Sequence, residues 1–393
     1  MDAIYLNALG LLCTLGNDVA SVRAALFDVR APSVAISSAF LPGKSVPVGE
    51  VQAQLADVEH LPLPLRSRNN ALVLSALAQI RADVDAAMAR YGAHRVAVVL
   101  GTSTSGIAEA ERAVAEHARD GQIPAEFDIG QQEMGSPALA LRAVLGCSGP
   151  AYVISTACSS SAKAIASAGR LLRAGLADAV VAGGADSLCG FTVAGFSALE
   201  SVSASGANPL AAGRDGIHIG EGAALFLMTR AAGRVRVAGH GESSDAHHIS
   251  APLPDGSGAR ASMQQALAMA GLGADDIDYI NLHGTATEQN DAMESRAVAA
   301  LFGDRVAVSS TKRLTGHTLG AAGAIEAALA WIALTDNPDG VLPPHWMVGP
   351  VDPGLPPLRI VTPGDRLGRP LRHVLSNSFA FGGSNATLIL AAT

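Results

Sequence analysis

The sequence predicts a protein of the α/β class, and three observations support that prediction. Short runs rich in β-branched residues, typical of buried strands, alternate with longer runs whose apolar residues recur at helical spacing. Within residues 151–182, a strand-like, a helix-like and a strand-like run follow one another, which is a βαβ unit and implies parallel pairing. The chain has 393 residues, 49% apolar and 16% charged, a composition that allows a substantial core and argues against disorder.

The first half of the chain contains this βαβ unit and one further strand. Arg95–Gly101 (RVAVVLG) predicts a buried strand that ends at a glycine. Ala151–Thr156 predicts a second strand, Ser159–Leu176 a helix and Ala177–Ala182 a third strand. Parallel strands joined by a crossover helix place this half in a layered α/β architecture.

The second half shows the same kinds of element. Ile277–His283 and Val306–Ser310 predict strands, and Leu319–Leu334 predicts a long apolar helix. His373–Ser378 and Ala386–Ala391 predict two strands joined by a glycine-rich turn.

The two halves also resemble each other in pattern. VISTACSSSAKAIASAGRLL and VSSTKRLTGHTLGAAGAIEAALA each read as a strand, a turn of small residues with a reactive side chain, and an alanine-rich helix. We therefore expect two similar halves, residues 1–230 and 231–393, that meet at one site. Residues 206–216 and 343–357 are expected to be surface loops.

Composition excludes several classes of function. The net charge of −8 argues against a nucleic-acid binder, which needs a dominant basic face. Four cysteines form neither a disulfide framework nor a cluster with zinc-ligand spacing. The N-terminal residues lack a basic region and predict a strand rather than a signal peptide, and no apolar stretch reaches the roughly 18 residues of a membrane span. We expect a soluble, cytoplasmic protein.

Cys158 is the first candidate for chemistry. It follows a predicted strand and opens a predicted helix, where the helix dipole and free N–H groups favour a thiolate and lower the pKa of a cysteine. Its small neighbours leave room for a bulky acyl group. The alternative is a buried structural cysteine, since free cysteines often behave as small hydrophobic residues.

Two histidines and a pair of charged residues are further candidates. His283 ends a predicted strand, where α/β proteins place their sites, although a polar strand end would look the same. His317 precedes the second alanine-rich helix, between Lys312 and Glu326 in sequence. A buried lysine and glutamate would pair and hold the histidine's loop. The alternative is a capping loop with a solvated lysine.

The turn Phe379–Asn385 (FAFGGSN) is the last candidate, because its backbone N–H groups can form an oxyanion hole. The alternative is a hairpin turn with core aromatics. Together, one cysteine, two histidines, one lysine and this turn suit thioester chemistry. A thiolate takes an acyl group, and two neutral histidines then donate hydrogen bonds to a second thioester carbonyl. Those bonds stabilise the enolate that forms when a malonyl group loses carbon dioxide.

At these residues the chain resembles the beta-ketoacyl-acyl-carrier-protein synthases of the elongating Cys-His-His type. The matching segments keep the family order and span most of the chain: TACSSSAKA, AGGADS, RDGIHIGEGAA, SSDAHHISAP, NLHGTATEQNDAMES, SSTKRLTGHTLGAAGAIEA and NSFAFGGSNATLIL. The resemblance implies a thiolase fold, with two βαβαβαββ halves in five αβαβα layers, and a dimer. It also implies decarboxylative Claisen condensation of malonyl-acyl-carrier protein with an enzyme-bound acyl chain.

The resemblance also implies roles for the candidates. Cys158 would be the acyl-accepting nucleophile, and His283 and His317 would support decarboxylation and condensation. Lys312 and Glu326 would form a supporting charged pair. The backbone N–H groups of Cys158 and Phe381 would form the oxyanion hole, and Phe381 and Phe379 would gate the acyl pocket. No metal or organic cofactor is expected, because the substrates arrive on the phosphopantetheine of an acyl carrier protein.

Departures from the family pattern point to a specialised subgroup. Glu200 stands near a position where many members have a basic residue that meets the carrier protein, which leaves Arg66 and Arg68 as docking candidates. Thr104 falls near an acyl-pocket position that is often larger and apolar, so a smaller, more polar wall is expected. The chain resembles the ketosynthases of bacterial aryl polyene pathways, in which a catalytic subunit often pairs with a chain-length-factor-like partner.

Several alternatives remain at this stage. The substrate is an aryl-polyenoyl chain, in an aryl polyene or related type II polyketide pathway, or a saturated chain, as in housekeeping fatty-acid elongation. The assembly is a homodimer or a heterodimer. A structural subunit that shapes a partner's tunnel is a hypothesis of another class, and the presence of Cys158, His283 and His317 counts against it.

Overall fold

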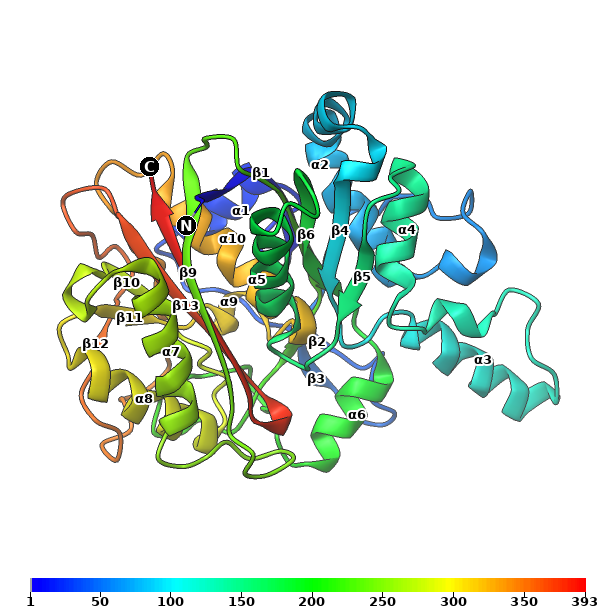
Figure 1. Cartoon of the computed structure of the whole chain (residues 1–393). Coiled ribbons are helices and arrows are strands. Elements are labelled where there is room, and N and C mark those ends of the chain that lie inside the picture. The colour runs from blue at the N-terminus through cyan, green and yellow to red at the C-terminus, as the bar shows by residue number, and fades with distance from the viewer. Residues whose placement is uncertain (1) are drawn as a thin grey trace.

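A computed structural model describes residues 2–393 and shows one large mixed sheet with helices on its faces (Figure 1). Eleven strands form this sheet in the order β12-β11-β10-β13-β14-β9-β1-β8-β6-β4-β5, and three form a small sheet in the order β2-β3-β7. The strands are β1 (Ile4–Cys13), β2 (Ala35–Ser37), β3 (Val46–Gly49), β4 (Val96–Gly101), β5 (Ala151–Ile154), β6 (Ala179–Asp186), β7 (Ile219–Gly220), β8 (Gly222–Thr229), β9 (Val235–Ser244), β10 (Tyr279–Asn281), β11 (Ala307–Ser309), β12 (Arg359–Ile360), β13 (His373–Ala380) and β14 (Ser384–Ala392).

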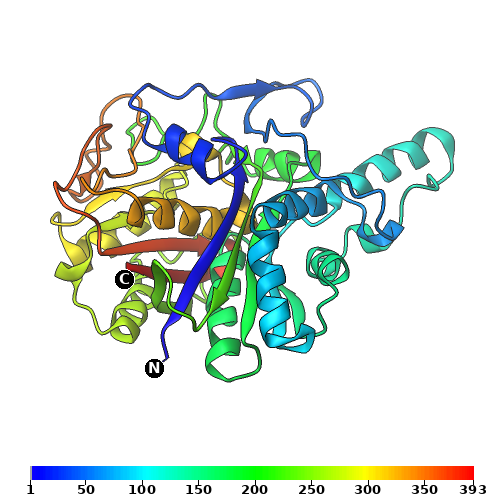
Figure 2. The ribbon, with the colours of Figure 1, turned by 90° about the horizontal axis from the view of Figure 1, so that it is seen from above.

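Ten α-helices lie in the described residues. They are α1 (Val19–Leu26), α2 (Arg68–Tyr91), α3 (Ile107–Asp120), α4 (Ser136–Leu145), α5 (Ser160–Arg173), α6 (Gly190–Ala198), α7 (Ser257–Ala270), α8 (Glu288–Phe302), α9 (Lys312–Thr315) and α10 (Ala322–Leu334). Most pack against the large sheet, whereas α3 projects from the body of the molecule in both ribbon views (Figures 1 and 2). No helix of residues 2–393 is long and apolar enough to cross a membrane.

The large sheet is built from two copies of one pattern. The first copy has the order β5-β4-β6-β8-β1 and the second β11-β10-β13-β14-β9. In each copy the first three strands are parallel and the last two join antiparallel. The copies meet where β1 pairs antiparallel with β9, with Ile4 opposite Val237. The sheet thus has the two similar halves that the fold class implies, and the bounds 1–230 and 231–393 stay predictions.

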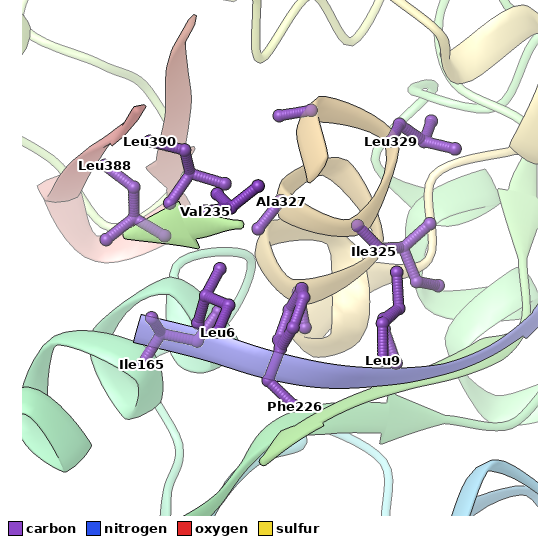
Figure 3. Close-up of a cluster of buried hydrophobic side chains, with 14 of the residues drawn as sticks. Leu6, Leu9, Ile165, Phe226, Val235, Ile325, Ala327, Leu329, Leu388 and Leu390 are labelled. Atoms are coloured by element: carbon purple, nitrogen blue, oxygen red, sulfur yellow. The ribbon is translucent and has the colours of Figure 1, made fainter. Parts of the chain in front are cut away.

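The two copies of the strand pattern act as two β layers, and the helices around and between them complete a five-layered structure. Helices α5 and α10 pack against each other and against strands of both copies in the largest core cluster. Figure 3 shows Ile325 and Ala327 of α10 among side chains from both copies, including Phe226 and Leu390. Helices α2 and α4 cover the outer face of the first copy, and α7 and α8 that of the second. The thiolase fold, with its αβαβα layers, is confirmed.

Small residues let the central helices lie close to the strands and to each other. A Cβ atom on Gly101 of β4 would lie 2.3 Å from the backbone nitrogen of Ser161 in α5. A Cβ atom on Gly323 of α10 would lie 2.7 Å from the Cβ atom of Ala162. The small side chains of both helices thus allow this close packing. The close packing brings together the turns that precede α5 and α10.

Two sequence predictions need correction. The predicted helix 319–334 is an α-helix only from Ala322, because Leu319–Ala321 forms a 3₁₀ turn. The stretch 206–216 is mostly buried rather than a surface loop. Polar side chains meet its backbone inside the protein: Asp291 accepts from the N–H of Leu210, and Nε2 of His345 lies 2.9 Å from the carbonyl oxygen of Pro209. The burial of this loop could not be predicted from its sequence, which is rich in glycine and has no clear apolar pattern.

Candidate active site

Cys158 lies in the short turn between β5 and α5. Ala157, immediately before it, has a φ of 51°, in the left-handed region that alanine seldom adopts. Ser160 stabilises the turn by accepting a hydrogen bond from the N–H of Thr156 at 2.9 Å. The cysteine side chain is buried, with 6% of its surface exposed. The strained turn thus aims the thiol into the interior, where the two halves meet.

His317 approaches the thiol from the corresponding turn of the second half, before α10. Its Nε2 lies 3.0 Å from Sγ of Cys158. Its backbone N–H donates to the carbonyl oxygen of His218 at 2.7 Å, which fixes the loop against the strand β7 region. Its Nδ1 has no hydrogen-bond partner within residues 2–393. The backbone hydrogen bond therefore positions this ring, and no hydrogen bond to Nδ1 fixes its tautomer, so either nitrogen can carry the proton.

His283 follows β10 and faces His317, with ring centroids 5.2 Å apart at 81°. Its backbone N–H and that of Gly284 donate to the two carboxylate oxygens of Glu294 on α8, at 2.8 and 2.7 Å. Burial, followed by the nearby Lys312 and His317, lowers the pKa of His283 well below its ordinary value. Burial and Lys312 lower the pKa of His317 in the same way. Both rings are therefore neutral at neutral pH.

Lys312 and Glu326 form a buried pair beneath His283. The lysine Nζ donates to Oε1 of Glu326 and to the carbonyl oxygen of His283, and it lies 3.4 Å from Nδ1 of His283. An ammonium group can only donate, so Nδ1 of His283 accepts and the ring proton sits on Nε2. Lys312 thus presets His283 as a hydrogen-bond donor toward the cavity.

Within residues 2–393, one group of side chains could hold a metal ion, and it consists of Cys158, His283 and His317. Donor atoms of Cys158, His283 and His317 lie within 4.8 Å of one another. A metal-binding nitrogen must carry no proton, whereas Lys312 keeps the proton on Nε2 of His283. The arrangement suits hydrogen bonding to a substrate better than metal binding.

The acidity of the thiol differs from the sequence expectation. Burial raises the pKa of Cys158 to about 12, although Lys312 and the backbone N–H groups of Phe381 and Cys158 itself oppose the shift. The expected lowering at a helix N-terminus is therefore wrong for this resting site, because the thiol is too well buried. The same two N–H groups face the sulfur, where the proposed oxyanion hole would lie.

A cavity of about 500 Å³ leads to these residues. Cys158, His283 and His317 line it together with Phe379 and Phe381. The ring of Phe381 packs against that of Phe196 from α6, with centroids 5.5 Å apart. Phe379 lies 6.2 Å from His283, measured between centroids. The aromatic turn thus stands beside the histidines. Sequence reasoning missed Phe196 of α6 and Glu294 of α8, because their contacts with Phe381 and His283 join segments that are distant in sequence or carry no local motif.

Five of the sequence candidates lie outside the lining of this cavity: Lys312 and Glu326, which lie beneath His283, and Thr104, Arg66 and Arg68. Thr104 donates from its N–H and its hydroxyl to Asp186, at 2.9 and 2.8 Å. Its hydroxyl is thus occupied, and a place for Thr104 in the acyl pocket stays a prediction. Arg68 donates to the buried carboxylate of Glu221 at 2.9 Å through Nε. Arg66 donates to the carbonyl oxygen of Leu61 at 2.8 Å and to Glu59 at 3.0 Å. Docking roles for Arg66 and Arg68 stay predictions.

The fold has the form that the resemblance to condensing enzymes implied, and the site brings Cys158, His283 and His317 together. Residues 67–233 match the family described as "Beta-ketoacyl synthase, N-terminal domain", and residues 235–348 match "Beta-ketoacyl synthase, C-terminal domain". The chain belongs to the beta-ketoacyl synthase family.

Individual relatives agree with this assignment. The chain is 43% identical to 3-oxoacyl-[acyl-carrier-protein] synthase 2 of Rhizobium meliloti (strain 1021) over 261 residues, covering 62% of this chain and 61% of that protein. It is 33% identical to nodulation protein E of the same strain over 400 residues, covering 98% of both. Among solved structures, the ketosynthase ApeO of Xenorhabdus doucetiae, in complex with its chain length factor ApeC, superposes with a TM-score of 0.93 at 44% identity and covers 100% of this chain and 98% of that chain.

Proposed function

We propose that this protein is a beta-ketoacyl-acyl-carrier-protein synthase that extends an acyl chain held on Cys158 by decarboxylative condensation with malonyl-acyl-carrier protein. The observation that carries the proposal is the convergence of the Cys158 thiol and the two neutral histidines, within 4.8 Å of one another, on a cavity of about 500 Å³. A buried thiol beside a neutral imidazole is equipped for acyl transfer.

In the first half-reaction, Sγ of Cys158 attacks the carbonyl carbon of the acyl thioester. The thiol proton passes to Nε2 of His317, 3.0 Å away, because that nitrogen can accept while Nδ1 carries the ring proton. The carbonyl oxygen, negative in the tetrahedral intermediate, lies between the N–H groups of Cys158 and Phe381. The carrier thiolate then leaves and takes the proton, and His317 is neutral again.

In the second half-reaction, the malonyl thioester carbonyl accepts hydrogen bonds from Nε2 of His283 and Nε2 of His317. His317 donates after a change of tautomer, which its unpartnered Nδ1 permits. The bond to the carboxylate breaks, carbon dioxide leaves, and the electron pair forms an enolate stabilised by the two donors. The enolate carbon attacks the acyl group on Cys158. A carbon–carbon bond forms, the sulfur leaves as a thiolate and takes up a proton from solvent, and the 3-oxoacyl chain departs on its carrier.

We further infer that the acyl chain is an aryl-polyenoyl chain, in an aryl polyene or related type II polyketide pathway, and that the partner subunit is a chain-length-factor-like ketosynthase. The similarity to ApeO, solved in complex with its chain length factor, supports this choice. A housekeeping role with saturated chains is the second candidate, supported by the 43% identity to the Rhizobium meliloti synthase.

Intact mass after incubation with acyl-carrier thioesters tests the proposal. Saturated medium-length and aryl-polyenoyl chains are offered to the protein alone and with its candidate partner. Cys158→Ala should abolish the adduct, whereas Cys189→Ala, which removes another buried thiol, should leave it intact. Loading by saturated chains alone would overturn the aryl polyene assignment. No adduct from any chain, with or without the partner, would favour a structural subunit.

A further inference from the structure

Asp186, the last residue of β6, carries a fully buried carboxylate. It forms no salt bridge within residues 2–393. Six N–H and O–H groups donate to it instead: the hydroxyl of Thr102, the N–H and hydroxyl of both Ser103 and Thr104, and the N–H of Gly320. None of these donors carries a charge, so they satisfy the carboxylate without neutralising it.

The donors to Asp186 come from both copies of the strand pattern. Residues 102–104 follow β4 in the first copy, whereas Gly320 belongs to the 3₁₀ turn Leu319–Ala321 in the second. The N–H of Gly320 donates to Oδ2 of Asp186 at 2.5 Å and to Oγ of Ser103 at 3.2 Å. A Cβ atom at position 320 would lie 2.8 Å from the same Oδ2, so the turn needs a glycine to come this close. Asp186 thus ties the end of β6 to a turn of the other half.

This turn begins two residues after His317. Leu319, its first residue, has a φ of 48°, in the left-handed region that residues with a side chain seldom adopt. Such strain persists only where the surrounding contacts impose it. On the near side of the turn, the N–H of His317 donates to the carbonyl oxygen of His218, and its own carbonyl oxygen accepts from the N–H of Gly220. On the far side, the hydrogen bond from Gly320 to the buried carboxylate holds the chain.

The charge of Asp186 also acts on the thiol. It is among the groups that raise the pKa of Cys158, whereas Lys312 lowers that pKa. Asp186 does not line the cavity, so it has no direct contact with a substrate bound there. Loss of its charge should make the thiol more acidic, whereas loss of its hydrogen bond from Gly320 should displace the turn after His317. The two effects can therefore be measured separately.

We propose that Asp186 is a positioning residue for acyl transfer. Through the N–H of Gly320, its carboxylate keeps Nε2 of His317 within reach of the thiol. The inference rests on the function proposed above, because it assigns Asp186 to the first half-reaction. Proton transfer to a base depends steeply on the position of the accepting atom. The segments GTSTSG and AGGADS thus supply the hydrogen-bonded support of that base.

Asp186→Asn tests the proposal in the full chain, with the candidate partner subunit present. The amide keeps the shape of the carboxylate but has one acceptor oxygen in place of two. The N–H of Gly320 therefore loses its acceptor when that oxygen serves Ser103 and Thr104. Intact mass follows the acylation of Cys158 by a small acyl-pantetheine thioester. We expect the limiting rate to fall about 10–100-fold, and the thioester concentration that gives half this rate to change by less than about three-fold.

Alkylation by iodoacetamide gives a second readout from the same variant. Because a negative charge is lost, Cys158 should be alkylated roughly three- to ten-fold faster at pH 8 than in the wild type, although its acylation is slower. The other three cysteines are also buried and serve as internal controls: Cys13, Cys147 and Cys189 should react as slowly as in the wild type. Faster alkylation of all four would indicate a loosened fold and would count against a positioning role.

Two further variants separate the hydrogen bond from the charge. Ser103→Ala removes a hydroxyl that contacts both the N–H of Gly320 and Asp186, but it keeps the charge of Asp186. It should slow acylation by roughly two- to five-fold and leave the alkylation of Cys158 unchanged. Asp304→Asn, at an exposed carboxylate beyond the end of α8, is the matched control and should change neither rate.

The wild type separates this inference from the proposed function. If it is acylated on Cys158 and a folded Asp186→Asn is acylated at the same rate, the positioning role is wrong and the function stands. If Asp186→Asn does not fold, an unchanged acylation rate in Ser103→Ala leads to the same conclusion. If no thioester of any kind acylates the wild type, the proposed function itself fails.

Discussion

The Nζ of Lys312 lies 3.4 Å from Nδ1 of His283 and donates to the carbonyl oxygen of the same residue. One lysine thus holds both the backbone and the ring of this histidine. Its charge is balanced by Glu326, which is buried as deeply as the lysine itself. The relationship sets the tautomer of His283, and with it the direction in which the ring can donate.

Removing this lysine should separate the two half-reactions. Lys312→Met alone would leave Glu326 as an unpaired buried charge, at a cost of roughly 3–5 kcal/mol, so it is combined with Glu326→Gln. We expect decarboxylation of malonyl carrier to fall by about 10²–10³-fold and acylation of Cys158 by less than about ten-fold. Release of carbon dioxide and intact mass measure the two steps. Equal losses in both would contradict the assigned role of Lys312.

The thiol of Cys158 should behave as a weak acid. Since burial raises its pKa to about 12, the thiolate fraction should rise about ten-fold for each unit of pH below that value. The rate of alkylation by iodoacetamide, mapped to the Cys158 peptide, should therefore increase from pH 7 to pH 9 without a plateau. A plateau below pH 8 would mean that the resting site holds a thiolate.

Glu294 should make stability depend on pH. Burial raises its pKa to about 7, although the N–H groups of His283 and Gly284 oppose the shift. Between the unfolded value near 4.5 and this folded value, the unfolded chain releases a proton that the folded protein retains. Stability from this group is therefore lost as pH rises through that window, by up to about 3 kcal/mol. Urea unfolding of the wild type and Glu294→Gln at pH 5 and pH 8 should show a smaller loss in the variant than in the wild type. Part of the loss should remain in both, because burial also raises the pKa of Glu326 to about 7.

Close packing at Gly101 should be sensitive to a single methyl group. In Gly101→Ala the new Cβ atom would lie 2.3 Å from a backbone atom of α5, the helix that follows Cys158. We expect a loss of roughly 1–3 kcal/mol in the free energy of unfolding and slower acylation of Cys158. Gly135→Ala, at a position with nothing within 4 Å, is the control and should be nearly neutral. Equal stability of the two variants would rule out the packing explanation.

The sequence predicted the strands and helices that carry the site because each has a strong local pattern. Val96–Gly101 is buried on both faces and reads as a continuous apolar run, and the alanine-rich helix α10 is buried along nearly its whole length. The reactive turns were recognisable because small residues flank Cys158 and His317. What local patterns could not give is long-range pairing. Three features depend on contacts between segments that are distant in sequence. They are the raised pKa of Cys158, the ion pair of Arg68 with Glu221, and the burial of residues 206–216.

The two copies of the strand pattern place Cys158 and His317 at corresponding positions, one before each central helix. Two identical copies would set the same side chain on both sides of the pseudo-symmetry axis. Acyl transfer needs a nucleophile on one side and a proton acceptor on the other. The chemistry proposed here therefore requires that the copies diverged after duplication, because a single ancestral half pairing with itself would lack one of the two roles.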